Sequence, residues 1–176
     1  FCDIYIIYNI LYYIMNYCPV KNSKCGGPEY NPDKWDLTKD EHEINNCYSY
    51  VMDIKEKDIL EKRQPGEFCG KEFEYDCDNL DEMVKCDFPN ITKIDSIDSS
   101  IPCNHYRIAL VLDKKGEHLD YHFYRQDLDG YWSHKTGNDP ISNLDASNNK
   151  ISDPEKIDRN YDKDNNDKFN YDIFCG

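Results

Sequence analysis

The stretch that most constrains the fold is HYRIALVLDKKGEHLDYHFYRQDLDGYWSHKTG, at residues 105–137, in which runs of strand-forming residues alternate with turn residues. Turns are expected at Lys114-Lys115-Gly116 and at Asp129-Gly130. Short turns of this kind join antiparallel neighbours, so the stretch predicts a three-stranded antiparallel meander. The predicted strands cover residues 107–112, 121–126 and 131–135.

The alternation of side chains along these strands indicates where two histidines lie. Successive side chains of a strand point to opposite faces, so His122, Tyr124 and Gln126 share one face of the second strand. Trp132 and His134 share one face of the third. We therefore expect the two histidines to lie within reach of the terminus of one helix packed on the sheet.

A helical region is expected ahead of the meander. Thr38 is followed three residues later by Glu41, which is the pattern of a capping box and predicts a helix start. Apolar residues then recur with helical spacing from Ile44 to Val51. The region is expected to end by Gln64-Pro65-Gly66.

Two versions of this helical region remain open, and they differ in where they place Cys47. In one, a single helix runs from about residue 39 to about residue 63 with Cys47 in its interior. In the other, Asn45 or Asn46 breaks the helix and caps a second one, because asparagine is a strong N-cap residue. The first turn of that second helix would hold Cys47, where the helix dipole favours a thiolate.

Length and charge limit the class of protein. At 176 residues the chain is about one domain long, and its net charge of −14 repels phosphate backbones and anionic lipid headgroups. Nucleic acid is therefore not expected as a partner. The single expected domain, 1–176, divides into an apolar N-terminal segment with a loop (1–35), a helical part (36–64), Cys-rich loops (65–103), the meander (104–137) and a loop-rich C-terminal part (138–176).

Nine cysteines without any Cys-x-x-Cys pair favour disulfides over a zinc ribbon or a thioredoxin-type site. Disulfides and the glycosylation sequon Asn90-Ile91-Thr92 both fit an oxidising secretory route, so a secreted or luminal protein is expected. The apolar start, FCDIYIIYNILYYIMNYC, is interrupted by Asp3 and two asparagines and is too short for a stable membrane span. A buried segment and a remnant of a signal or anchor both remain open for it.

Three features together resemble a known superfamily: Asn46-Cys47-Tyr48 at a helix start, Pro65-Gly66-Glu67 after it, and His105-Tyr106-Arg107 leading the meander. In this order they resemble the papain-like cysteine hydrolases, especially the NlpC/P60-type and CHAP-type amidase branch, over residues 44–137. The branch usually has a small residue after the cysteine, where this chain has Tyr48. The resemblance implies an α+β fold in which a Cys-bearing helix packs on a small antiparallel sheet, here with disulfide-tied loops.

The resemblance implies a cysteine nucleophile, a histidine base and a third polar group. Cys47 is the expected nucleophile, and His122 and His134 are favoured as base and neighbour over His105, which fits the order of the branch better but lacks a hydrogen-bonding surface. Cys47 as a buried thiol and the histidines as ordinary strand residues are the structural alternatives. Asn46 or Gln126 would complete the oxyanion hole, and the orienting group remains open among Gln126, Asp127 and Asp145.

Two functions follow, with an intermediate between them. The first is a papain-like cysteine hydrolase that cleaves an amide bond in a peptide or a cell wall. The alternative is a non-catalytic secreted or surface binding module that holds a protein partner on the aromatic face of the sheet, and an inactive relative of such an enzyme lies between the two. No cofactor or metal site is expected. The acidic run that begins at Asp162 is not an EF-hand loop, because it has Asp167 and Ile173 where such a loop requires Gly and Glu, but loose binding of a cation to this run remains open.

Overall fold

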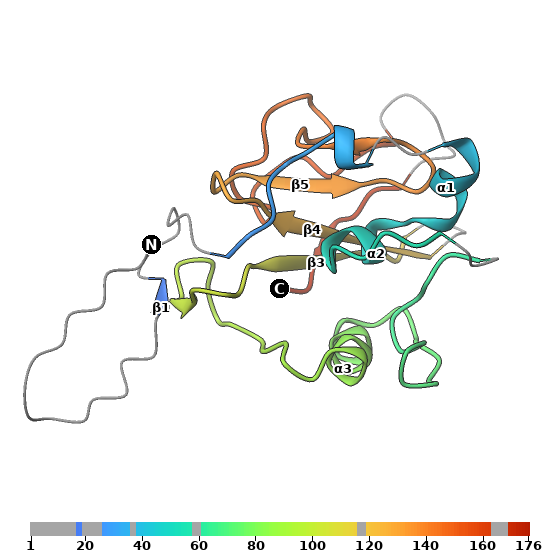
Figure 1. The fold of residues 1–176 in the computed structure, drawn as a ribbon, viewed down its shortest axis with the longest axis horizontal. Coiled ribbons are helices and arrows are strands. Elements are labelled where there is room, and N and C mark those ends of the chain that lie inside the picture. Colours follow the sequence, from blue (N-terminus) through green and yellow to red (C-terminus); the bar gives the residue numbers. More distant parts are fainter. Residues whose placement is uncertain (1–16, 19–25, 36–37, 58–60, 116–118, 163–168) are drawn as a thin grey trace, which may run out of the picture.

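A computed structural model describes residues 17–18, 26–35, 38–57, 61–115, 119–162 and 169–176. Its centre is an antiparallel sheet, with short helices on one side and loops on the other (Figure 1). The helices are η1 (Asp33–Trp35, a 3-10 turn), α1 (Lys39–Ile44), α2 (Cys47–Val51) and α3 (Cys77–Asp87), and the strands are β1 (Tyr17–Cys18), β2 (Ile101–Pro102), β3 (Ile108–Asp113), β4 (Asp120–Gln126), β5 (Trp132–Lys135), β6 (Ile141–Ser142) and β7 (Ile173–Phe174).

The predicted meander forms the middle of a five-stranded sheet with the order β6-β5-β4-β3-β7. Val111 of β3 lies opposite His122 of β4, and Arg125 of β4 lies opposite Ser133 of β5. Both ends of β3, β4 and β5 lie within one residue of the ends predicted from the sequence. At one edge of this sheet, β7 near the C-terminal end pairs with β3.

Helix α2 packs on one face of the sheet and forms the main hydrophobic core with it (Figure 1). Tyr48 and Val51 of α2 are fully buried there, and the Tyr48 ring lies against the Phe123 ring with their centroids 5.6 Å apart. Leu80 and Val84 of α3 complete this core. Most of the stabilisation of so short a helix must come from this burial, because isolated helices of this length do not form in water.

The opposite face of the sheet is covered by the C-terminal part of the chain, which has little regular structure. Ile151 and Tyr171 are buried against Ala109, Val111 and Tyr124 in a second core. Both faces of the meander are thus occupied, which explains why β4 is buried over nearly its whole length.

The helical region follows the second of the two open versions. The Thr38 capping box with Glu41 is present and begins α1, which ends at Asn45 in an extended conformation. Asn46 then caps α2, because its side-chain oxygen accepts a 3.0 Å hydrogen bond from the Ser49 backbone N–H. Cys47 therefore occupies the first position of α2, as that version predicts. Helix α2 ends at Val51, well before the expected end near Pro65.

Helix α3 lies in the part of the chain where only disulfide-tied loops were expected, so that expectation is wrong in part. Asp76 caps the N-terminus of α3. The buried residues of α3 are Leu80, Met83 and Val84, which form one narrow apolar stripe along the helix. The expected disulfides are present, and they link Cys69 to Cys86 and Cys77 to Cys175. Both bridges hold α3, one to the loop before it and one to the residue after β7.

The apolar segment 1–16 lies outside the described residues. Among the helices that are described, none is long and apolar enough to cross a membrane.

Candidate functional site

Cys47 is a buried thiol without a disulfide partner. It packs in the core with Tyr121 and Phe123, on the face of the sheet that α2 covers. Burial raises the pKa of the Cys47 thiol to about 12, and the nearby Asp120 carboxylate adds to this effect. The expectation that the helix start favours a thiolate is therefore wrong, because desolvation outweighs the dipole of a five-residue helix.

His122 and His134 lie together, as the strand pattern predicts. The His122 Nε2 and His134 Nδ1 atoms are 2.8 Å apart, and His134 Nε2 lies 3.1 Å from the Leu144 carbonyl oxygen. A carbonyl can only accept, so His134 carries its proton on Nε2, its Nδ1 accepts, and His122 Nε2 donates. Burial lowers the pKa of His134 to about 4 and that of His122 well below its ordinary value, so both rings are neutral.

The sheet separates the histidine pair from Cys47. His122 stacks on Tyr171 and meets Tyr124 edge to face, and both tyrosines belong to the second core. Cys47 contacts the neighbouring β4 residues, whose side chains point the other way. The structure thus joins the two imidazoles and does not bring the thiol to them.

The two expected oxyanion groups have structural partners. The Asn46 amide caps α2 and donates to the Arg63 carbonyl oxygen at 2.8 Å. Gln126 accepts from the Arg107 guanidinium at 2.9 Å and donates to the Gly130 carbonyl oxygen at 3.2 Å. Neither amide faces the thiol and an imidazole together.

The other candidates have separate places. His105 is half-buried, with its Nδ1 2.9 Å from the Asn104 side-chain oxygen. Asp145 accepts hydrogen bonds from the backbone N–H groups of Ser147 and Asn149, so it orders its own turn. Asp127 bonds to Arg125.

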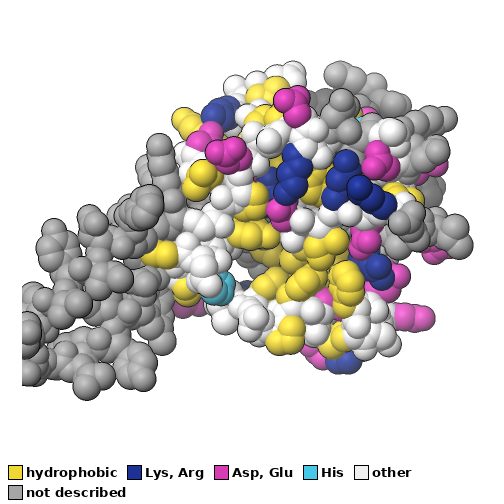
Figure 2. Space-filling view, viewed as in Figure 1, with side chains coloured by type: hydrophobic (Ala, Val, Ile, Leu, Met, Phe, Trp, Pro, Cys, Tyr) yellow, Lys and Arg dark blue, Asp and Glu magenta, His cyan; other side chains and the backbone are white. Residues whose placement is uncertain are grey.

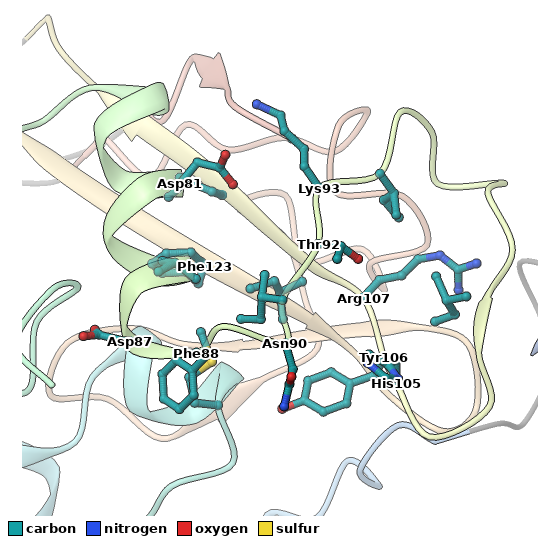
Figure 3. A pocket seen from close by; sticks show the side chains of 18 of the residues that line it. Asp81, Asp87, Phe88, Asn90, Thr92, Lys93, His105, Tyr106, Arg107 and Phe123 are labelled. Carbon is teal, nitrogen blue, oxygen red and sulfur yellow. The ribbon is translucent and has the colours of Figure 1, made fainter. Parts of the chain in front are cut away.

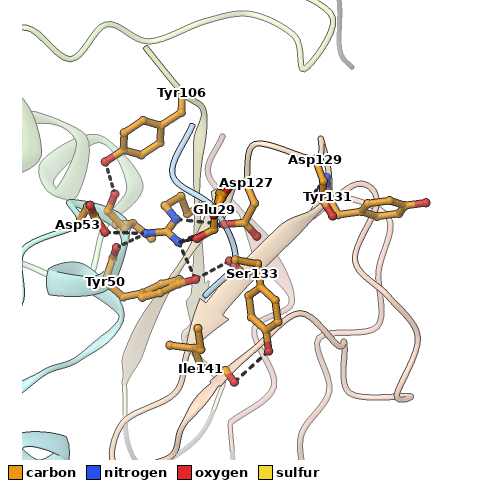
Figure 4. Close-up of polar contacts among 12 residues, drawn as sticks. Glu29, Tyr50, Asp53, Tyr106, Asp127, Asp129, Tyr131, Ser133 and Ile141 are labelled. Atoms are coloured by element: carbon orange, nitrogen blue, oxygen red, sulfur yellow. Dashed lines mark hydrogen bonds and ion pairs between the residues drawn. The ribbon is translucent and has the colours of Figure 1, made fainter. Parts of the chain in front are cut away.

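A buried network centred on Arg125 was not predicted from the sequence (Figure 4). The Arg125 side chain is fully buried, and it donates to the Tyr50 hydroxyl at 2.8 Å and to Asp127 at 3.1 Å. The Tyr50 hydroxyl lies 2.6 Å from the Ser133 hydroxyl, so the network ties α2 to both β4 and β5. One feature of the sequence could have indicated this network: Arg125 is a charged residue within a predicted strand, on the same face as Tyr121 and Phe123.

The aromatic docking face proposed for the sheet does not exist in the folded chain. Tyr124, Arg125 and Trp132 are at most 2% exposed, because α2 covers one face and the C-terminal loops cover the other. Tyr131 is the exposed aromatic of that group, at 41%. The side chains of Tyr124, Arg125 and Trp132 are therefore not on the surface where a partner could bind them.

Sequence comparison gives the relationship of this chain to a known protein. Over 132 residues it is 35% identical to insoluble matrix shell protein 1 of Ruditapes philippinarum, and the alignment covers 74% of this chain and 80% of that protein. The chain belongs to the family of this shell protein. No protein-family model matches it, and no solved structure matches it.

Membership of the shell protein family corrects one prediction and confirms another. The resemblance to papain-like hydrolases is wrong, because the relative is a shell matrix protein. The expectation of a secreted protein is confirmed, since a matrix protein of a shell is extracellular and the described chain contains two disulfides. What is shown of the fold is a mixed helix and antiparallel sheet structure with these disulfides. Within the described ranges no group of three or more His, Cys, Asp or Glu side chains is arranged to hold a metal ion.

Proposed function

We propose that this chain is a non-catalytic structural protein of an insoluble extracellular matrix of the shell type. The observation that carries the proposal is the 35% identity to insoluble matrix shell protein 1, over 80% of the length of that protein. Identity spread over so much of both chains reflects a shared domain rather than a shared motif.

The placement of the reactive groups supports a structural role. Cys47 is protonated and buried, and the two neutral histidines are satisfied by each other and by the Leu144 carbonyl. The polar groups of the Arg125 network likewise bind one another. Groups that an enzyme would present in a cleft are used here to join α2, the sheet and the C-terminal loops.

The surface supports contact with positively charged matrix components. Residues 67–82, which lead into and form the first half of α3, contain seven carboxylates and one lysine, which is a net charge of −6. Glu72, Glu74 and Asp78 are exposed and form no ion pair within the described part of the chain. Such a field attracts cations and cationic surfaces.

The proposal is tested by locating the chain in the hard tissue of its source. The tissue is demineralised in acid, and the insoluble material is extracted with detergent. The solid that remains is digested with protease and examined by mass spectrometry. We expect peptides of this chain in the insoluble solid. Peptides confined to the soft tissue, or to the soluble extract, would overturn the proposal.

Adsorption to mineral tests the contribution of the acidic surface. The purified chain is mixed with calcium carbonate crystals, and the bound fraction is measured after sedimentation. The triple variant Glu72→Gln, Glu74→Gln, Asp78→Asn should bind less than a control that loses three charges elsewhere, at Glu43, Glu61 and Glu155. Equal binding by both variants would show that this surface has no special part.

A further inference from the structure

A pocket of about 410 Å³ lies between α3, the segment 88–94 after it, and β3 (Figure 3). Hydrophobic side chains gather around a hollow in the same region of the surface (Figure 2). This volume falls within the range of small-molecule sites in proteins. The apolar lining includes Val84, Phe88, Ile101, Leu110 and Phe123.

Arg107, which directly precedes β3, is the buried charge in the lining of this pocket. The residue is only 5% exposed. Its guanidinium donates to the Gln126 side-chain oxygen at 2.9 Å and to the Ser99 carbonyl oxygen at 2.6 Å, while its Nε–H has no hydrogen-bond partner. Both partners are neutral, so the positive charge is not neutralised by direct contact.

The second deeply buried arginine of the chain shows the contrast. Arg125 forms ion pairs with Asp127 at 3.1 Å and with Asp53 at 3.3 Å. No carboxylate of the described residues lies within ion-pair distance of Arg107, and Asp98 acts on it only from farther away. A buried charge without a counter-charge is costly, and a bound anion would remove that cost.

The carboxylates that line the pocket are already committed. Asp81 pairs with Lys85 at 2.7 Å. Asp87 accepts hydrogen bonds from the Tyr48 hydroxyl and from the Gly66 and Cys69 backbone N–H groups. The exposed Lys93 adds a positive charge at the rim. Asp81 and Asp87 lie on the α3 side of the pocket and Arg107 on the opposite side (Figure 3), so an anion is favoured at the Arg107 end although the whole chain is strongly acidic.

We propose that this pocket binds an aliphatic carboxylate, with the hydrocarbon chain against the apolar lining and the carboxylate paired with Arg107. An arginine matches a carboxylate with two parallel hydrogen bonds, and its free Nε–H is one of the donors such a pair uses. A multiply charged phosphate or a sugar does not fit, because most of the lining is apolar. This inference is independent of the structural function proposed above.

Calorimetric titration of the secreted chain with dodecanoate, below the concentration at which it forms micelles, tests the proposal. Dodecanol, which has the same chain and no charge, is the matched ligand. We expect one dodecanoate per chain and at least tenfold weaker binding of dodecanol. No binding of dodecanoate, or equal binding of the two ligands, would overturn the proposal, and this comparison needs no variant.

Two variants locate the site. Arg107→Gln should weaken dodecanoate binding at least tenfold and leave dodecanol binding unchanged, whereas Ile94→Trp, which fills the pocket, should weaken both. Arg63→Gln removes a half-buried cation outside the pocket and should change neither. Full dodecanoate affinity in folded Arg107→Gln would overturn the assignment of the carboxylate to Arg107, and folding of each variant is checked by thermal unfolding.

A second inference concerns Asn90, and it rests on a different observation. Asn90-Ile91-Thr92 is the one Asn-x-Ser/Thr sequence in the chain. Asn90 and Thr92 are exposed, on the turn after α3 that the Ile91 N–H closes by bonding the Phe88 carbonyl oxygen at 2.9 Å (Figure 3). The Asn90 amide forms no hydrogen bond with a described residue, so a substituent on it breaks no hydrogen bond of the fold. Asn90 lies in the lining of the pocket described above.

We infer that Asn90 carries an N-linked glycan in the secreted protein. The amide nitrogen attacks the first sugar carbon of a lipid-linked oligosaccharide diphosphate, the carbon–oxygen bond to the diphosphate breaks, and the amide loses one proton. The chain is expressed in secreting animal cells, treated with peptide-N-glycosidase and digested. We expect aspartate at position 90 after treatment and no glycan on Thr92→Val, whereas Thr92→Ser should retain it. An unmodified Asn90 in the secreted chain would refute the assignment.

Discussion

The His122 Nε2 and His134 Nδ1 atoms are joined by a 2.8 Å hydrogen bond in a part of the sheet from which water is excluded. This bond requires at least one of the two rings to be neutral, because two imidazolium rings have no acceptor between them. Burial and the neighbouring ring both lower the pKa of His122. The pair therefore links protonation to the packing of β4 on β5.

The first prediction concerns stability at mildly acidic pH. Unfolded histidines take up protons near pH 6.5, whereas folded His134 does so only near pH 4. The unfolded state therefore binds more protons, so the free energy of unfolding is highest above pH 6.5 and falls as the pH decreases toward 4. His134 alone accounts for a loss of roughly 3 kcal/mol over that window.

Urea unfolding at several pH values between 4.5 and 7.5 measures this loss. The double variant His122→Phe, His134→Leu should show a much flatter dependence on pH. His105→Gln removes a half-buried histidine outside the pair and should keep the dependence of the unmodified chain. A stability that is constant between pH 6.5 and 5 would contradict the neutral buried pair.

The second prediction concerns the Arg125 network. Tyr50→Phe deletes a hydroxyl that lies 2.8 Å from Arg125 and 2.6 Å from the Ser133 hydroxyl, and it leaves both groups buried without that partner. We expect a loss of about 2–3 kcal/mol in the free energy of unfolding. Tyr30→Phe is the matched control, because its hydroxyl makes one weak 3.4 Å bond to the Ile141 carbonyl in a half-buried position. Similar losses in the two variants would show that the Tyr50 hydroxyl contributes no more to stability than a weak, half-buried hydrogen bond does.

The third prediction concerns the reactivity of Cys47. A rise in the thiol pKa from 9.0 to about 12 reduces the thiolate fraction at neutral pH about 1000-fold, and burial also blocks access. Cys47 in the folded chain should therefore resist iodoacetamide at pH 8 and react once the chain is unfolded in urea. Peptide mapping by mass spectrometry follows that one residue. Rapid alkylation in the folded chain would restore the possibility of a reactive thiol.

The elements that the sequence predicts well are those specified by residues close together in the chain. The meander depends on alternation and on turns such as Asp129-Gly130, and the start of α2 depends on Asn46 next to Cys47. Local patterns carry this information because the contacts that form these elements are themselves local.

The parts that were missed depend on contacts between distant residues. Tyr171 stacks on His122 although the two residues are far apart in the sequence. The loop that carries Tyr171 has no periodic pattern, so the sequence does not indicate that this loop covers a face of the sheet. Helix α3 has a single stripe of three buried apolar residues among acidic ones, and two disulfides hold it in place. The sequence could place Cys47 and the histidines on their elements, but which face α2 covers depends on the whole core.

The fourth prediction compares the two disulfides. The Cys77–Cys175 bridge spans 98 residues, whereas the Cys69–Cys86 bridge spans 17. In the chain-entropy description, the longer loop restricts the unfolded state more, so the two bridges contribute about 4.7 and about 3 kcal/mol. Replacing Cys77 and Cys175 by serine should therefore lower the midpoint of urea unfolding more than replacing Cys69 and Cys86. A larger effect from the short bridge would contradict this order. It would show that keeping the Gly66–Gly70 turn against Asp87, to which the Gly66 and Cys69 backbone N–H groups donate, matters more for stability than loop length.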